Sequence, residues 1–174
     1  MENCVVVYKS KTGFTEKYAT WIAEELGCEL YPLANVNMVN LSDYDMIIFG
    51  GGVRAGKISG IKFVNNTRIS FPNKKLVIFA TGATPSNETE AIEKVQNMNV
   101  PRNSGIPFFY FQSGFNYEKM KGVDKLVMNM VRGIMRKMKD KDGAQNEMIG
   151  AMKNSYDHSS REFIEPLVSY VKAL

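Results

Sequence analysis

Five short apolar runs, separated by stretches with helical spacing, constrain the fold of this 174-residue chain more than any other feature. Two of them, 45–50 and 75–80, are apolar along almost their whole length, which is typical of strands buried on both faces. The others are 4–8, 28–33 and 107–111. Strands that alternate with helices form a parallel sheet with right-handed crossovers. We therefore expect an α/β fold, a three-layer, doubly wound sheet of five parallel strands.

Helical spacing connects these runs. The pattern is clear over 14–26, weak over 61–69, and clear again from Glu88 to about Asn97, where Ser86 is the expected N-cap. A long helix is expected over 118–139 and a last one over 161–172. Pro166 falls inside the last helix and predicts a kink or a later helix start there.

Composition places the chain among ordinary proteins with a packed core. Hydrophobic residues make up 44% and charged residues 23%. There is no linker and no internal repeat, so we expect one domain over 1–174. The N-terminus has no basic start followed by a long apolar run, and no apolar run could span a bilayer, so we expect a cytoplasmic protein.

The turn after the first apolar run carries the clearest chemistry. It combines three hydroxyl residues and a glycine at the start of a helix, where backbone N–H groups lack partners and the helix dipole is positive. These features favour a bound phosphate. The alternative is an ordinary N-cap at Thr12 or Thr15, which would explain one hydroxyl but not three. The candidate phosphate-binding residues are Ser10, Lys11, Thr12, Gly13, Phe14 and Thr15.

Three further loops follow strands and are expected at the same edge of the sheet. In open parallel sheets, ligands bind beyond the carboxyl ends of the strands. We therefore expect one site from all four loops. The residues added by these loops are Gly51, Gly52, Val53, Arg54, Ala55 and Gly56; Thr81, Gly82, Ala83 and Thr84; and Ser113, Gly114, Phe115 and Tyr117.

Several other kinds of functional site lack the residues that they require. The segment 51–57 fits G-x-x-x-x-G-K, but Ile58 stands where a nucleotide hydrolase needs Ser or Thr to bind magnesium. A phosphate-accepting receiver domain needs carboxylates after the first and third strands, and none is present there. Cys4 and Cys28 are expected to be free thiols, and His158 is the only histidine. We predict no metal site and no catalytic acid or base.

The sequence Ser-Lys-Thr-Gly-Phe-Thr at 10–15 resembles the flavodoxin phosphate loop, [ST]-x-T-G-x-T, and matches every fixed position. The resemblance implies strand order 2-1-3-4-5 and a non-covalent FMN. It also implies that 51–60 and 81–84 flank the isoalloxazine ring. Neither of those two loops has an aromatic residue, although flavodoxins often stack aromatics on the ring from there. Phe115 and Tyr117 are the nearest candidates, with a place in the core as the alternative.

The chain is basic, with net charge +4 and pI about 9.0, whereas simple flavodoxin electron carriers are commonly acidic. The basic excess falls on 118–141, where apolar residues follow one helical face. Such a helix either contacts a membrane surface or packs in the core with a solvated basic face.

Arg54, the stretch around Tyr117 and Tyr156-Asp157 before the last helix are similar to menaquinone-dependent protoporphyrinogen oxidases. Those are FMN enzymes of the inner membrane face. We expect a flavodoxin-like FMN redox protein, either an oxidoreductase or an electron carrier, with a redox partner protein or a quinone. The alternatives are a quinone-linked protoporphyrinogen oxidase, peripheral at the inner membrane face, and a flavin-free binding module. We expect no nucleic acid partner, and the oligomeric state stays open.

Overall fold

The computed structural model describes residues 3–36, 40–116, 118–119, 122, 125–126, 129–130 and 155–174. Internal contacts divide the chain into two compact units. One unit comprises residues 1–113 together with 159–174, and the other comprises residues 114–158. The expectation of a single domain over 1–174 stays a prediction.

The larger unit is built on a mostly parallel sheet in the order β2-β1-β3-β5-β6. All neighbouring pairs along this path are parallel. The short β4 adds an antiparallel pair to β3, which the sequence did not predict. Without β4 the order is the expected 2-1-3-4-5, so the predicted α/β fold is confirmed. The strands are β1 (Cys4–Lys9), β2 (Glu29–Pro32), β3 (Met46–Arg54), β4 (Lys57–Ile58), β5 (Lys75–Gly82) and β6 (Phe108–Gln112).

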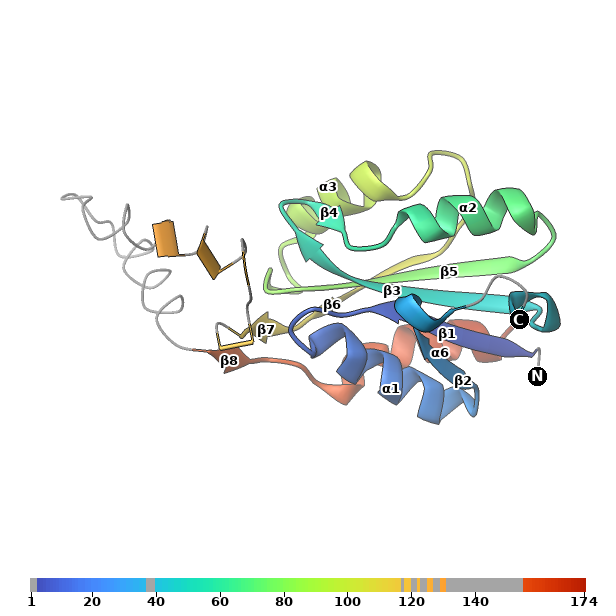
Figure 1. Cartoon of the computed structure of the whole chain (residues 1–174), viewed down its shortest axis with the longest axis horizontal. Helices are drawn as coiled ribbons and strands as arrows, with labels where there is room; N and C mark the ends of the chain where they lie inside the picture. The colour runs from blue at the N-terminus through green and yellow to red at the C-terminus, as the bar shows by residue number, and fades with distance from the viewer. Residues whose placement is uncertain are drawn as a thin grey trace. The chain divides into compact units, whose positions relative to one another are not determined.

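Helices cover both faces of this sheet, with α1 and α6 on one side and α2 and α3 on the other (Figure 1). The helices are α1 (Phe14–Leu26), α2 (Lys62–Ser70), α3 (Thr89–Asn99) and α6 (Glu165–Lys172). The 3-10 segments are η1 (Leu33–Asn35), η2 (Asn40–Asp43) and η3 (Arg161–Ile164).

Two expectations about helix ends can be checked. Pro166 is the second residue of α6, so the later helix start is confirmed, since proline fits the first turn of a helix. The prediction that Ser86 caps α3 is wrong. Glu88 is the N-cap residue of α3, with no side-chain cap, and the Ser86 N–H donates to Gln112 Oε1 at 3.1 Å.

Alternation along β1 produces two cores. Val6 and Tyr8 pack with α1 and α6, whereas Val5 and Val7 pack with α2. The same alternation continues in β3 and β5, whose central residues are all buried. Both faces of the central strands are therefore removed from water, as their unbroken apolar runs predicted.

Gly50 allows a phenylalanine ring to pack directly on the backbone of β3. It lies beside Phe79 in the register of β3 and β5, and a Cβ built on Gly50 would lie 1.9 Å from Phe79 Cζ. Phe79 is fully buried and packs on Phe111 with ring centroids 5.5 Å apart. The Phe79 ring thus occupies the space that any side chain at 50 would need.

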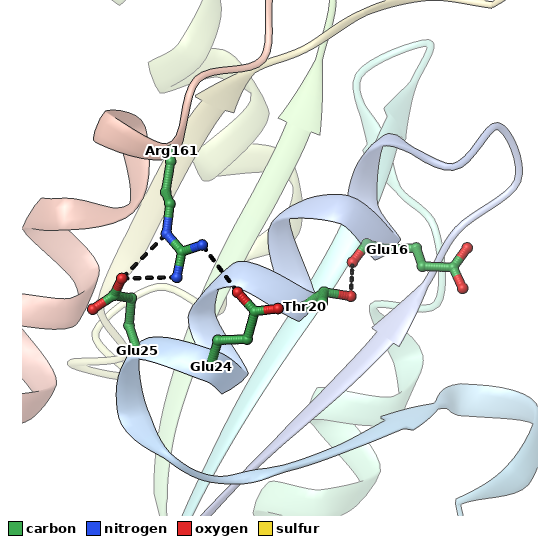
Figure 2. Close-up of polar contacts among 5 residues, drawn as sticks. All are labelled: Glu16, Thr20, Glu24, Glu25 and Arg161. Carbon is green, nitrogen blue, oxygen red and sulfur yellow. Dashed lines mark hydrogen bonds and ion pairs between the residues drawn. The ribbon is translucent and has the colours of Figure 1, made fainter.

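The last segment of the chain returns to α1 through ionic and polar contacts. Arg161 Nη2 and Nε contact Glu25 Oε1 at 2.8 and 3.1 Å, and Nη1 contacts Glu24 Oε2 at 3.0 Å (Figure 2). These carboxylates raise the pKa of Arg161. Because the groups are about half exposed, solvent screens these pairs, and we expect their contribution to stability to be small.

Tyr18, in the middle of α1, binds two main-chain groups of the larger unit. One lies just before residues 114–158 in the sequence, and the other lies just after them. Its hydroxyl donates to Gln112 O and accepts from Ser160 N–H at 3.3 Å. Beside it, Lys17 Nζ donates to Ser159 Oγ at 2.8 Å. The points where the chain leaves and re-enters the larger unit are therefore held on one helix.

Both cysteines are free, as predicted. A hydrogen bond with Cys4 and burial together raise the pKa of the Cys28 thiol. Cys28 therefore stays protonated at neutral pH, which makes it a poor nucleophile.

Gly50→Ala should destabilise the larger unit by about 1–3 kcal/mol, because the new methyl group overlaps the buried Phe79 ring. The free energy of unfolding measures this, from urea titration followed by circular dichroism. In a Phe79→Leu background the same change should cost clearly less, since the ring is gone. Equal costs in the two backgrounds would show that Phe79 is not the obstacle.

Candidate functional site

The carboxyl ends of three neighbouring strands meet at one edge of the larger unit. Lys9 at the end of β1 lies beside Gly51 of β3, and Gly52 lies beside Thr81 of β5. Three of the four predicted loops therefore come together, as the parallel arrangement requires.

The turn from β1 into α1 leaves its helix start without a side-chain cap. Gly13 is the N-cap residue, with φ 96°, a left-handed value that suits glycine. Its N–H donates to Ser10 Oγ at 3.1 Å, which closes the turn. Neither Thr12 nor Thr15 caps the helix, so the N-cap alternative is wrong.

The hydrogen-bond donors of this turn fit an anion. The N–H groups of Phe14, Thr15 and Glu16 have no intrahelical partner, because they belong to the first turn. Thr12 is half-buried, and its hydroxyl makes no hydrogen bond within the described part of the chain. A phosphate at this helix start would receive hydrogen bonds from several N–H groups and one hydroxyl.

A buried pair of threonines joins the turn to the β5 loop. Thr15 Oγ1 and Thr81 Oγ1 lie 2.7 Å apart, and both residues are only 3% exposed. A Cβ at Gly52 would lie 3.3 Å from Thr15 Oγ1, so Gly52 belongs to the same contact. The Thr15 side chain therefore joins the two loops, and its backbone N–H, in the first turn of α1, remains available to a ligand.

The stretch 51–56 is largely not a loop, contrary to the expectation. β3 continues to Arg54, and Ala55 and Gly56 form the two-residue turn of a hairpin with β4. Both turn residues have positive φ, 47° and 77°, as in the type I′ turns that join twisted strands. The glycines suggested a loop, but Gly51 lies under the returning strand: its Cβ would be 2.5 Å from Ile58 Cγ2 and from Ser59 O.

Asn99, the last residue of α3, binds this hairpin. Its Oδ1 accepts from Ile58 N–H at 2.8 Å, and its Nδ2 donates to Gly56 O and to Val95 O, both at 2.7 Å. The residue is 8% exposed. The hairpin, with Arg54 and Lys57 exposed beside its turn, is thus fixed to α3.

The 81–84 segment is fixed from the β6 side. Tyr110 donates its hydroxyl hydrogen to Thr84 O at 3.1 Å, and the Ser113 N–H donates to Gly82 O at 2.7 Å. A Cβ at Gly82 would lie 2.6 Å from the Tyr110 hydroxyl, which explains the glycine. Ala83 is the exposed residue of the segment.

The remaining predicted residues are Gly114, Phe115 and Tyr117. Gly114 and Phe115 belong to the smaller unit, where β7 (Gly114–Phe115) pairs with β8 (Tyr156–Asp157). The Phe115 ring stacks on Tyr156, with centroids 6.3 Å apart and planes at 27°. Tyr117 lies outside the described residues. Their part in a site stays a prediction.

Two polar side chains that flank the turn in sequence, Tyr8 and Glu16, form a hydrogen bond with each other. Tyr8 donates to Glu16 Oε1 at 3.0 Å. Burial, and after it the Glu16 carboxylate, raises the pKa of Tyr8, so its hydroxyl stays protonated at neutral pH. Among the described residues, no group of His, Cys, Asp and Glu could hold a metal ion.

A sequence model described as the flavodoxin domain matches residues 5–142, more than half of the chain. The chain belongs to the flavodoxin-domain family. The match begins in β1 and includes all the strand ends described above.

Individual proteins resemble this flavodoxin domain over part of its length or at low sequence identity. An uncharacterized protein of Methanocaldococcus jannaschii is 38% identical over 82 residues, which cover 47% of this chain and 55% of that protein. The chain thus spans about half the length of the curated relative it matches. A flavoprotein of Lactobacillus acidophilus, solved in complex with FMN, is 15% identical with TM-score 0.46, over 64% of this chain and 93% of that one. A flavodoxin from the domain Archaea is 15% identical with TM-score 0.44, over 87% of this chain and 99% of that one.

The residues that fix the loops of this flavodoxin domain were not found from the sequence. Asn99, Tyr110 and Tyr18 act through contacts with residues far away along the chain. The sequence around a single Asn or Tyr in a helix or strand does not indicate which distant residue it will bind. Only the folded arrangement of helices and strands brings them to their partners.

Thr15→Val should cost about 1–3 kcal/mol of unfolding free energy, because it leaves the buried Thr81 hydroxyl without its partner. Thr15→Val combined with Thr81→Val should cost less than the sum of the two single changes. The measurement is a double-mutant cycle from urea unfolding. Additive costs would mean that the two hydroxyls do not interact.

Proposed function

We propose that this flavodoxin domain binds FMN at the carboxyl edge of its sheet and passes electrons through it. The observation that carries the proposal is the uncapped start of α1 behind the turn 10–15, at the edge where the ends of β1, β3 and β5 meet. The match to the flavodoxin domain and the FMN named in the Lactobacillus acidophilus structure are consistent with it.

Different residues of the larger unit would bind the phosphate and the ring of such a cofactor. The N–H groups of Phe14 and Thr15 and the hydroxyl of Thr12 would bind the phosphate, and Lys11 would add charge. The β3–β4 hairpin and the 81–84 segment would flank the ring. FMN, when bound, supplies the one- and two-electron chemistry. In this proposal the residues of the larger unit hold and shield the cofactor.

A redox partner protein or a quinone fits the proposal equally. Oxidation of protoporphyrinogen stays a prediction from resemblance, since nothing in the larger unit favours it over simple electron transfer. An assay with protoporphyrinogen and a menaquinone analogue, run beside reduction by a flavodoxin reductase, distinguishes the two.

Thr12→Val should weaken FMN binding by roughly ten- to a hundred-fold, because it removes a hydrogen bond to a charged phosphate while nearly keeping volume. Titration of apoprotein with FMN, followed by quenching of flavin fluorescence, measures the dissociation constant. Thr20→Val is the matched control, since the Thr20 hydroxyl donates to Glu16 O within α1. Wild-type protein that takes up no FMN at micromolar concentrations would overturn the proposed function.

We also propose, as a separate function, that 118–141 contacts an anionic membrane surface. Among the described residues of this stretch, Leu126 and Met130 are 64% and 61% exposed. They are four residues apart, the spacing of one helical face. Lipid would bury such side chains while the basic residues of the stretch bind its headgroups. No helix in the described part of the chain is long and apolar enough to cross a bilayer.

Leu126→Asn together with Met130→Asn should abolish or strongly reduce co-sedimentation with anionic vesicles, because the apolar insertion is lost. Added salt should weaken binding of the wild type, since charge attraction is screened. Ile69→Asn is the control, because Ile69 is 76% exposed on α2 of the other unit. Wild-type protein that stays in the supernatant at low salt would rule out the membrane contact and leave the FMN proposal intact.

A further inference from the structure

The β3–β4 hairpin has an open edge that a single side chain completes. Among the strands of the described residues, β4 pairs with β3 alone. On its other side, Gly56 O and Ile58 N–H are two residues apart, the spacing at which a strand presents an acceptor and a donor to a neighbour. Asn99 supplies both partners, with Nδ2 at 2.7 Å from Gly56 O and Oδ1 at 2.8 Å from Ile58 N. Its carboxamide takes the place of the backbone N–H and C=O of one residue of a further strand.

The same side chain also binds its own helix. Asn99 Nδ2 donates to Val95 O, four residues earlier, at 2.7 Å. The amide plane is therefore fixed by α3 and is not free to follow the hairpin. Met98 lies against the turn from the same helix end, because a Cβ at Gly56 would be 3.1 Å from its Sδ. The position of the turn is thus set by the last two residues of α3.

A two-stranded hairpin is only marginally stable without further packing. The contacts with Asn99 and Met98 therefore help to fix its conformation. The hairpin is closed at its base by the Ser59 N–H, which donates to Gly52 O at 2.9 Å. Its turn includes Ala55, a residue with a side chain in a left-handed conformation (φ 47°), which costs energy relative to glycine. The bonds to Asn99 hold the turn in place against this cost.

We propose that Asn99 is a positioning residue for the flavin ring, acting through the hairpin that it holds against α3. The inference rests on the proposed FMN site and adds to it a residue that touches no phosphate-binding group. Its effect should therefore fall on binding of the ring and leave phosphate recognition unchanged.

Comparing the affinities for FMN and for riboflavin, which has the same ring and no phosphate, tests this inference. Asn99→Leu should weaken FMN and riboflavin by the same factor, roughly tenfold, because the ring contacts are common to both. Thr12→Val should weaken FMN and leave riboflavin unchanged. Asn97→Leu is the matched control, because Asn97 is exposed on α3, and it should change neither affinity. The visible spectrum of bound FMN should also differ between Asn99→Leu and wild type, since the ring environment changes.

The outcomes separate the inference from the function on which it rests. Wild type that binds neither flavin overturns the proposed function, and the role of Asn99 with it. Wild type that binds FMN but no riboflavin, or Asn99→Leu with unchanged affinities, overturns the inference alone. If Asn99→Leu does not fold, Asn99→Asp is measured in the same way. It keeps the acceptor for Ile58 N–H and loses the donor to Gly56 O, so it should also weaken both flavins.

Discussion

Burial of both faces of the central strands is the constraint on which this architecture depends. β1, β3 and β5 have apolar side chains on both sides, and α1 with α6 and α2 with α3 cover them. A parallel sheet covered in this way can turn its loops outward only at its two ends. The polar chemistry of the larger unit therefore collects at the carboxyl edge, because the sides of the sheet are already occupied.

The loops at this edge are held in place by side chains that form hydrogen bonds with other parts of the protein. Thr15 and Thr81 bind each other between two loops, Tyr110 binds the carbonyl of Thr84, and Asn99 binds the hairpin. Each bond joins elements that are distant in sequence. A site fixed in this way loses less conformational entropy when a ligand binds, which favours affinity.

The predictable part of the structure was the part encoded locally. The apolar runs identified the strands, and 10–15 identified the turn before α1, because periodicity and turn residues act over a few neighbours. The strand order 2-1-3-4-5 was implied by the resemblance to flavodoxins. The hairpin was missed because a run of glycines is typical of a loop. Here Gly51 is glycine because Ile58 packs over it. Asn99 was missed because its partners lie about forty residues earlier.

Tyr18 has a consequence for how this protein could have evolved. Its hydroxyl binds Gln112 O and Ser160 N–H at once, so the two ends of the 114–158 excursion lie at one point of the larger unit. When the ends of a segment are already held together, each doubling of its length adds only about 0.6 kcal/mol of closure entropy. The intervening segment can therefore be lengthened, shortened or exchanged at little energetic expense to the sheet. A new partner specificity could be acquired there while the edge that carries the candidate site stays as it is.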